Sequence, residues 1–314
     1  MRKTIFKTLF VCSLCCISSL SFANLSSNRH QAETENLSVY LNQIISSSKY
    51  RNHTQVEELN RVSAWIQGQM QKFGIPCDFQ NYMVESNRYR NVVCELNVGA
   101  AKNLIVGAHY DVHGETDGAD DNASGVVGVL ETARILAKEK RHLKHNVEFV
   151  FYTLEEPPYF RTEQMGSAVH AKAIEKYKDR ITGVFILEMI GYFDQRNIQE
   201  YPAGLKFFYP AHGNFIGAVS NFDSNSLGSE YCAAMKQINR LDCQRLVAPS
   251  FVTGVDFSDH LNYWNADIPA IMITDTAFFR NKNYHTPNDK VETLNLQKMK
   301  HVIDGVVLTI LNIK

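Results

Sequence analysis

Several motifs that mark common enzyme classes are missing from this chain. It has no HExxH sequence, the zinc-binding motif of many metalloproteases, and no GxSxG sequence that would carry a nucleophilic serine. It also has no GxG-type loop for phosphate, so nucleotide binding finds no support. A block of basic residues is absent too, which argues against nucleic acids and anionic lipids as partners.

Long apolar runs are also missing, apart from a short one at the N-terminus. Residues 1–23 begin with Arg2 and Lys3, continue with a mostly apolar stretch and end in small residues at Ala23. This order is typical of a secretory signal peptide, and the apolar stretch is too short for a membrane anchor. We therefore predict cleavage after Ala23 and a secreted or periplasmic protein without a membrane attachment. Removing these residues takes away three basic residues and no acid, which changes the formal net charge from -1 to -4.

Cysteine is scarce, and its distribution indicates disulfides. Three of the seven cysteines lie in the predicted signal peptide. The four that remain are Cys77, Cys94, Cys232 and Cys243. They contain no CxxC pair, which makes metal binding by these cysteines the lesser option. Four cysteines in an exported protein allow three pairings, of which we favour the local ones, Cys77–Cys94 and Cys232–Cys243.

The hydrophobic pattern predicts an α/β fold. No repeat or low-complexity linker interrupts residues 24–314, which we interpret as a single domain whose polar start, 24–35, is loosely ordered or trimmed. Nearly all-apolar, strand-like runs alternate with helical segments. The strand-like runs are 103–110, 146–156, 181–193 and 268–276, and the helical segments are 123–140, 162–177 and 294–312. This alternation predicts a mostly parallel, mixed central sheet with helices on both faces. Residues 195–255 show little pattern apart from a helix near 226–240.

Acidic and imidazole side chains follow the buried runs. His109 follows "LIVGA" in the first run, Glu155–Glu156 follow "VFYTL" in the second, Glu188 follows "VFIL" in the third, and His285 lies in the loop after the last run. Ligands of open α/β sheets bind beyond the carboxyl ends of the strands. These residues are therefore expected to meet at one edge of the sheet.

These residue types suit a pair of metal ions. Zinc takes imidazole and carboxylate ligands, and a paired site needs a carboxylate that bridges both ions. The sequence offers ligands for such a site: His109, an Asp of "ADDNASG", Glu156, Glu188 and His285. Asp111 lies two residues after His109 and is placed to orient its imidazole. Glu155 is left without a metal, as a general base requires.

The chain resembles the M28 family of co-catalytic zinc aminopeptidases from about residue 55 to the C-terminus. The motifs that carry the resemblance are "GAHYD", "GADDNASG", "EE", "GS" at 166–167, "LEMIGY", "SDH" at 258–260 and "YHTPNDKVETL". No single motif is decisive, but all occur in the family's order. The resemblance implies the fold of the zinc-dependent exopeptidases.

The resemblance also implies a distribution of ligands. His109 and Glu188 would hold one zinc ion, and Glu156 and His285 the other. Asp121, which lies four residues before the Gly of "ASG", would bridge the two ions. At position 188 this chain has Glu where the best-known members have Asp, which puts the geometry of that zinc in question.

Two further features follow from the resemblance. The peptide bond between Asp121 and Asn122 is expected to be cis, and Glu155 matches the general base that passes a proton from water to the leaving amine. The cysteines that some members carry just before "SDH" are absent here. For this reason substrate preference cannot be transferred from those members.

Together these observations predict a secreted, monomeric aminopeptidase with two zinc ions, acting on peptides with free N-termini. The nearest rival is glutaminyl cyclase, a related acyltransferase with one zinc. A third alternative is an inactive, receptor-like scaffold of the same fold. Among other residues, His113 lies near the expected ligands, but the scheme does not require it. His212 and His260 are candidates to line the pocket, and Asp259 and Asp275 are candidates to support the ligands.

Overall fold

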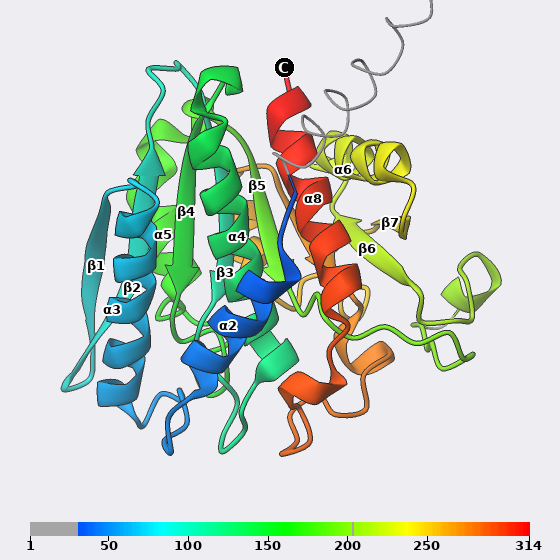
Figure 1. The fold of residues 1–314 in the computed structure, drawn as a ribbon, viewed down its shortest axis with the longest axis horizontal. Coiled ribbons are helices and arrows are strands. Elements are labelled where there is room, and N and C mark those ends of the chain that lie inside the picture. The colour runs from blue at the N-terminus through cyan, green and yellow to red at the C-terminus, as the bar shows by residue number, and fades with distance from the viewer. Residues whose placement is uncertain (1–30, 203) are drawn as a thin grey trace, which may run out of the picture.

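A mixed β-sheet runs through the molecule (Figure 1). The computed structural model describes residues 31–202 and 204–314, so the predicted signal peptide, residues 1–23, lies outside the described residues. Hydrogen bonding gives the strand order β1-β2-β4-β3-β5-β8-β6-β7. The strands are β1 Cys77–Val84, β2 Asn87–Leu96, β3 Asn103–His109, β4 Asn146–Tyr152, β5 Ile181–Glu188, β6 Phe215–Ser220, β7 Asp242–Val247 and β8 Ala270–Thr274.

The centre of the sheet is parallel and its flanks contain antiparallel pairs. Strands β4, β3, β5 and β8 run parallel to one another, as the alternating pattern predicts. The hairpin β1–β2 is antiparallel and joins β4 in antiparallel register, while β6 is antiparallel to β8 and parallel to β7. The α/β class with a mixed sheet is thus confirmed, and four of the seven neighbouring pairs are parallel.

The central strands are buried on both faces because their side chains are apolar on both. In β3, Leu104 and Val106 belong to one hydrophobic cluster, whereas Ile105 belongs to a second cluster on the other face. Side chains alternate between the faces of a strand, and full burial of each stabilises the fold by roughly 1.5–3 kcal/mol. A strand of this kind must be covered on both sides.

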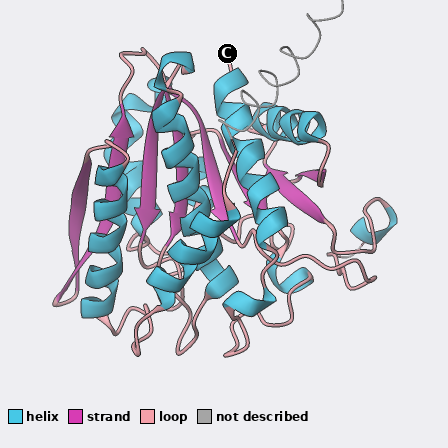
Figure 2. Ribbon diagram, in the orientation of Figure 1, coloured by secondary structure: helices cyan, strands magenta, loops and turns pink. Residues whose placement is uncertain are grey.

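Helices provide that cover (Figure 2). They are α2 Thr34–Ile45, α3 Val56–Lys72, α4 Gly125–Lys138, α5 Gly166–Ile174, α6 Asn225–Ile238, α7 His260–Asn265 and α8 Leu296–Asn312. Residues of α2, α3, α4, α6 and α8 make up about half of the larger cluster, and residues of α5 and α7 pack in the second. The α6 helix confirms the one predicted near 226–240.

The predicted loose ordering of residues 24–35 is wrong for its described part, residues 31–35. Ala32 is buried, and its backbone N–H donates to the Asp304 carboxylate at 2.7 Å. The N–H of Glu33 donates to Glu131 at 2.8 Å, and α2 begins at Thr34. These contacts fasten the start of the described chain to α4 and α8.

The segment 195–255, which shows little pattern in the sequence, contains two strands. β6 is short, buried and antiparallel to its neighbour β8, and β7 lies at the edge with mostly half-exposed side chains. Helix α6 connects the two strands, which pair in parallel, but β6 is short and β7 mixes polar with apolar residues, so neither gives a clear strand pattern in the sequence. The rest of the segment forms long connections over this part of the sheet.

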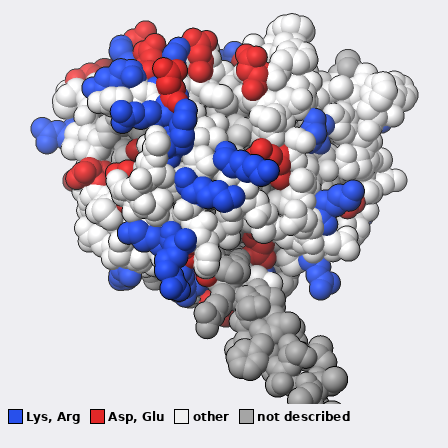
Figure 3. Space-filling view, turned by 90° about the horizontal axis from the view of Figure 1, so that it is seen from above, with Lys and Arg blue, Asp and Glu red and all other residues white. Residues whose placement is uncertain are grey.

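No helix of the described residues is long and apolar enough to cross a membrane. On the face that contains the C-terminal end of α8, basic and acidic side chains are interspersed (Figure 3). That face therefore has no large surface of a single charge.

The two predicted disulfides are present, one at each edge of the sheet. Cys77–Cys94 joins the edge strand β1 to β2 at positions that face each other in the register. Cys232–Cys243 joins the opposite edge strand, β7, to α6. Cross-linking positions 17 and 11 residues apart closes short loops and so limits the freedom of the unfolded chain.

We expect the variant Cys77→Ala/Cys94→Ala to lose roughly 3 kcal/mol of unfolding free energy, because its unfolded chain regains the entropy of the open loop. Urea denaturation of the oxidised proteins measures this difference. As a control, reductant should destabilise the parent protein more than the variant, which keeps only one disulfide. Equal stability of parent and variant under oxidising conditions would contradict the assigned role.

Candidate active site

The carboxyl ends of the parallel strands bring the predicted residues together. β3 ends at His109 and β5 at Glu188, while Glu155 and Glu156 follow β4 within four residues. The remaining two come from connections: Asp121 from the turn that precedes α4, and His285 from the loop after β8. Parallel strands end on the same edge, which is why residues so distant in sequence meet.

Two groups of side chains share Asp121. One oxygen of Asp121 lies 3.5 Å from His109 Nε2, and the other lies 3.1 Å from His285 Nε2. His109 Nε2 is also 3.3 Å from Glu188, and His285 Nε2 is 3.2 Å from Glu156. The potential ligand atoms within each group lie within 4.8 Å of one another. Asp121 thus presents one oxygen to each group, as a bridging carboxylate would.

The chemistry of these atoms fits zinc. His109 Nε2, His285 Nε2 and one oxygen of Glu156 are buried without a hydrogen-bond partner. Buried polar atoms are nearly always hydrogen-bonded, so unpartnered ones that point toward one another indicate a ligand. Imidazole nitrogen and carboxylate oxygen are the donors that zinc takes in catalytic sites. The residues present therefore fit a pair of zinc ions.

The site also has an excess of negative charge. Four buried carboxylates, those of Asp121, Glu155, Glu156 and Glu188, converge here. Among the described residues, their ion-pair partners are histidines alone, with neither Lys nor Arg within 4.0 Å. Buried charges of one sign need compensation, which divalent cations supply.

The pKa values of the site reflect this crowding. Burial, reinforced by the charge of Asp121, raises the pKa of Glu156 to about 8. Burial likewise raises the pKa of Glu155 well above its usual value, with Glu188 and Glu156 adding to the effect. Burial alone would lower the pKa of His285, but its contacts with Asp121 and Glu156 outweigh this and raise it to about 10. The pocket thus favours cationic partners for its carboxylates.

Backbone conformation is unusual beside the site. Leu154, which precedes Glu155, has φ 59°, Met189, which follows Glu188, has φ 48°, and His285 itself has φ 56°. Non-glycine residues rarely adopt positive φ, and each costs of order 1–3 kcal/mol. Such conformations are common at active sites, where a side chain must be held in one orientation. The Asp121–Asn122 peptide bond is cis, as predicted.

Besides His109, the partner predicted from the sequence, Asp111 contacts two backbone groups. Its carboxylate lies 3.5 Å from Nδ1 of His109. It also accepts the backbone N–H groups of Glu155 at 3.2 Å and Glu156 at 3.1 Å. Asp111 therefore links the loop after β3 to the loop after β4.

Three neighbours of the ligands were not identified from the sequence. Ser258 donates to Glu188 at 2.6 Å, and Asp289 accepts the N–H of Asp121 at 3.0 Å. The side chain of Asn122 donates to the Leu187 carbonyl at 2.8 Å and so fixes the turn against β5. Ser258 and Asp289 lie within "SDH" and "YHTPNDKVETL", so the motifs contained them without revealing their contacts.

A buried arginine holds the loop between the first two ligands. Arg51 donates to the carbonyls of Tyr110 at 2.9 Å, Asp117 at 2.6 Å and Gly118 at 2.9 Å. Its own carbonyl accepts the N–H of Val112 at 3.1 Å. Gly118 has φ 55°, and a Cβ there would collide with backbone and side chains around it. Arg51 thus closes both ends of the loop that connects His109 to Asp121.

The secondary candidates have distinct positions. The ring of His113 stacks on that of His285 with centroids 4.0 Å apart. His260 is fully buried and does not line the pocket, because its Nε2 donates to the Val255 carbonyl at 2.8 Å and its ring packs on Trp264. Asp275 is also buried and accepts the N–H of Tyr192 at 2.8 Å.

Residues 91–310 match the family described as Peptidase family M28. A protein of Escherichia coli K12 called uncharacterized protein YfbL is 39% identical over 92% of this chain and 91% of its own length. Leucine aminopeptidase 1 of Pyrenophora tritici-repentis is 25% identical over 76% of this chain, and the match covers 60% of that relative.

Solved structures share the fold. The LapA aminopeptidase of Legionella pneumophila has a TM-score of 0.70 and 20% identity over 98% of this chain and 78% of its own. The glutaminyl cyclase of Porphyromonas gingivalis has a TM-score of 0.68 and 17% identity over 89% of this chain and 98% of its own. At these identities the similarity establishes the architecture alone.

Replacing Arg51 should destabilise the protein. Arg51→Met leaves three carbonyl oxygens without their donor, two of them in buried and one in a partly buried hydrogen bond, and each unsatisfied buried group costs about 1–3 kcal/mol. We expect a loss of at least about 3 kcal/mol in urea denaturation. The matched control is Arg88→Met, an exposed arginine of β2, which should change stability by less than about 0.5 kcal/mol. Equal effects of the two substitutions would show that Arg51 does not hold the loop.

Proposed function

The chain belongs to peptidase family M28 and is a hydrolase of that family, and on this premise we propose that it is an exported aminopeptidase that uses two zinc ions. The observation that carries the proposal is the position of Asp121 between His109 and His285, with one oxygen toward each imidazole. A carboxylate shared in this way serves a paired-metal site.

Each ligand has a role in the proposal. His109 and Glu188 would hold one ion, and Glu156 and His285 would hold the other, with Asp121 shared between the two groups. When bound, zinc supplies Lewis acidity that polarises a carbonyl group and makes water more acidic. Glu188 stands where the best-known members have the shorter Asp, and the hydrogen bond from Ser258 orients its carboxylate.

Glu155 is the general base of the proposal. It is buried and lies 3.9 Å from His109 Nε2, beyond a direct hydrogen bond with it. Its carboxylate also lines the pocket, where water and a peptide carbonyl can approach. From there it takes a proton from the attacking water and delivers it to the departing amine. Asp111 positions it by accepting its backbone N–H.

The pocket beside the ligands gives the substrate its place. Asp121, Glu155, Glu156 and Glu188 form one end of the pocket, and the rest of its lining is mostly apolar. Acidic groups at this end suit the α-ammonium of a peptide N-terminus, while the apolar part takes the first side chain. This arrangement supports removal of single residues from free N-termini.

Export is part of the proposal. The pattern of residues 1–23 indicates a signal peptide, and two disulfides are typical of oxidising compartments. We assign the secreted or periplasmic space to the mature chain, as a monomeric single domain that covers residues 24–314.

Glutaminyl cyclase is the second candidate, favoured by the fold shared with the Porphyromonas gingivalis protein. A single zinc would leave half of the paired groups without a purpose, including His285 and Glu156 if His109 held the ion. An inactive scaffold is less well supported, because Glu155 and the candidate ligands converge here.

Glu155→Gln is expected to lower kcat by at least about 10²–10⁴-fold while zinc content stays at the parent level, because the amide cannot accept the proton. Turnover of aminoacyl amides and metal analysis measure the two effects. The matched control is Glu163→Gln, an exposed glutamate of the following loop, which should retain full turnover. A Glu155→Gln protein as fast as the parent would remove Glu155 from the mechanism.

Metal stoichiometry separates the two candidate enzymes. Protein saturated with zinc and freed of excess metal should contain about two zinc ions per chain, and Asp121→Asn should lower the affinity of both. Chelator competition followed by metal analysis gives these values. About one zinc per parent chain would support the cyclase and reject the paired site.

A further inference from the structure

Of the five candidate ligands, His285 is the least enclosed by the protein. Its side chain is 22% exposed, and those of the other four are at most 8% exposed. It also lies outside the sheet, in the loop after β8, with φ 56°. Non-glycine residues rarely adopt this backbone conformation, so contacts of the ring itself are expected to hold it in the orientation that a metal ligand needs.

The usual support for a ligating imidazole is a hydrogen bond to its second nitrogen. His109 has a partner of this kind, because the Asp111 carboxylate lies 3.5 Å from its Nδ1. Among the described residues, Nδ1 of His285 makes no such hydrogen bond, and the carboxylates of Asp121 and Glu156 lie at its Nε2. The two imidazoles of the site are therefore held in different ways.

Two rings enclose the imidazole of His285. The ring of Tyr284 is stacked on it with centroids 3.7 Å apart and planes 16° apart. The ring of His113 is stacked on it with centroids 4.0 Å apart and planes 4° apart. Two rings this close and this parallel cannot both fit on one face of an imidazole, so they cover opposite faces. His285 is thus the middle ring of a stack of three.

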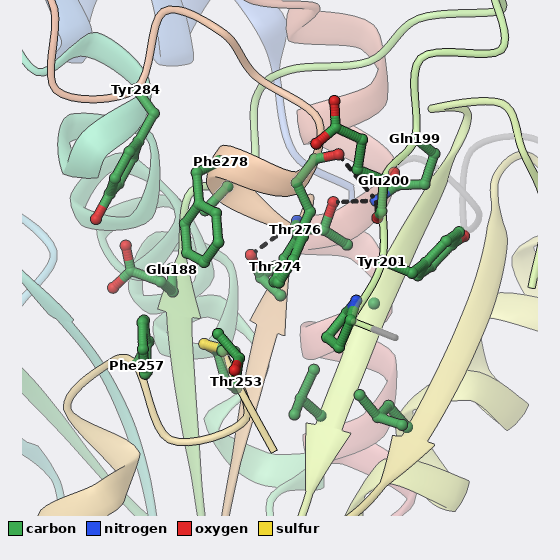
Figure 4. Close-up of a pocket in the computed structure, with 18 of the residues that line it drawn as sticks. Glu188, Gln199, Glu200, Tyr201, Thr253, Phe257, Thr274, Thr276, Phe278 and Tyr284 are labelled. Carbon is green, nitrogen blue, oxygen red and sulfur yellow. Dashed lines mark hydrogen bonds between the residues drawn. The ribbon is translucent and has the colours of Figure 1, made fainter. Parts of the chain in front are cut away.

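The two outer rings of the stack differ in their relation to the pocket. Tyr284 lines the pocket, on the same side as Glu188 (Figure 4), and its ring packs against Phe278 with centroids 5.6 Å apart. His113 is not one of the residues that line the pocket. A change at His113 therefore alters the support of His285 without altering the walls that a substrate contacts.

The backbone is fixed on both sides of His113. The N–H of Val112 donates to the Arg51 carbonyl at 3.1 Å, and the Gly114 carbonyl accepts from the Asn52 side-chain amide at 2.6 Å. The side chain of Val112 is also buried. Because its backbone is held in this way, the ring of His113 provides a fixed surface against which His285 packs.

We propose that His113 is a positioning residue for one zinc ion: its ring fixes that of His285 and so strengthens the binding of the ion that His285 and Glu156 would hold. The inference rests on the proposed two-zinc function. The stack takes the place of the hydrogen bond that supports His109. The ion assigned to His109 does not depend on this stack, so the two ions should respond differently to a change at position 113.

Zinc affinities of variants at position 113 test this role. In chelator competition on the mature protein, the parent should bind two zinc ions. His113→Ala should weaken the binding of one by about tenfold and change that of the other by less than about twofold. His113→Phe should restore most of the lost affinity, because its ring can stack but cannot coordinate a metal. The matched control His142→Ala, at an exposed histidine before the amino end of β4, should bind zinc as the parent does.

A second background identifies the affected ion. His285→Ala should abolish tight binding of the ion that His285 would hold, and adding His113→Ala to it should then lower zinc affinity no further. A further loss in that background, or parent affinities in His113→Ala, would overturn the inference and leave the paired site intact. Equal losses in His113→Phe and His113→Ala would also overturn it, since they would make His113 a ligand and not a stacking partner. A parent chain that binds about one zinc ion would instead count against the proposed function itself.

Discussion

The structure of this site depends on one carboxylate that faces two imidazoles. Asp121 can hold this position only if its backbone is fixed, and Asp289 accepts its N–H for that purpose. The adjoining Asp120 accepts the Gly191 N–H and the Asn281 amide, which joins the turn before α4 to the loops after β5 and β8. Groups that repel one another are thus held close by hydrogen bonds from the surrounding loops. For this reason, a change that destabilises those loops is also expected to disturb the positions of the site residues.

The supporting contacts come from outside the set of ligands. Arg51 stabilises the loop between His109 and Asp121 through three carbonyls, although it lies before the region that matches the family. The stack of His113 on His285 restricts the orientation of the His285 ring. Positive φ at Leu154 and Met189 indicates that these loops contain backbone strain, which the fold tolerates because it orients the neighbouring site residues. The rigidity of the site is therefore a property of the connections as much as of the sheet.

Sequence reasoning found the parallel centre of the sheet because buried strands are apolar on both faces, and the same logic placed His109 and Glu188 at strand ends. It did not find β6, whose short apolar run contains Gly217, although α6 follows it and connects it to its parallel neighbour β7. Arg51 left no signal either, since its partners are backbone carbonyls that any residue type provides. The pocket was not predicted either, because its walls come from segments near residues 200, 250 and 278, which only the folded chain brings together. The site residues themselves remain a prediction that geometry supports.

A disulfide lies at each edge of the sheet. An open edge strand presents unpaired peptide groups and can recruit further strands from other copies of a protein. Here β1 cannot separate from β2, nor β7 from α6, without breaking a sulfur–sulfur bond. While the chain is oxidised, neither edge strand can therefore detach from its native neighbour and exchange with the corresponding strand of another copy.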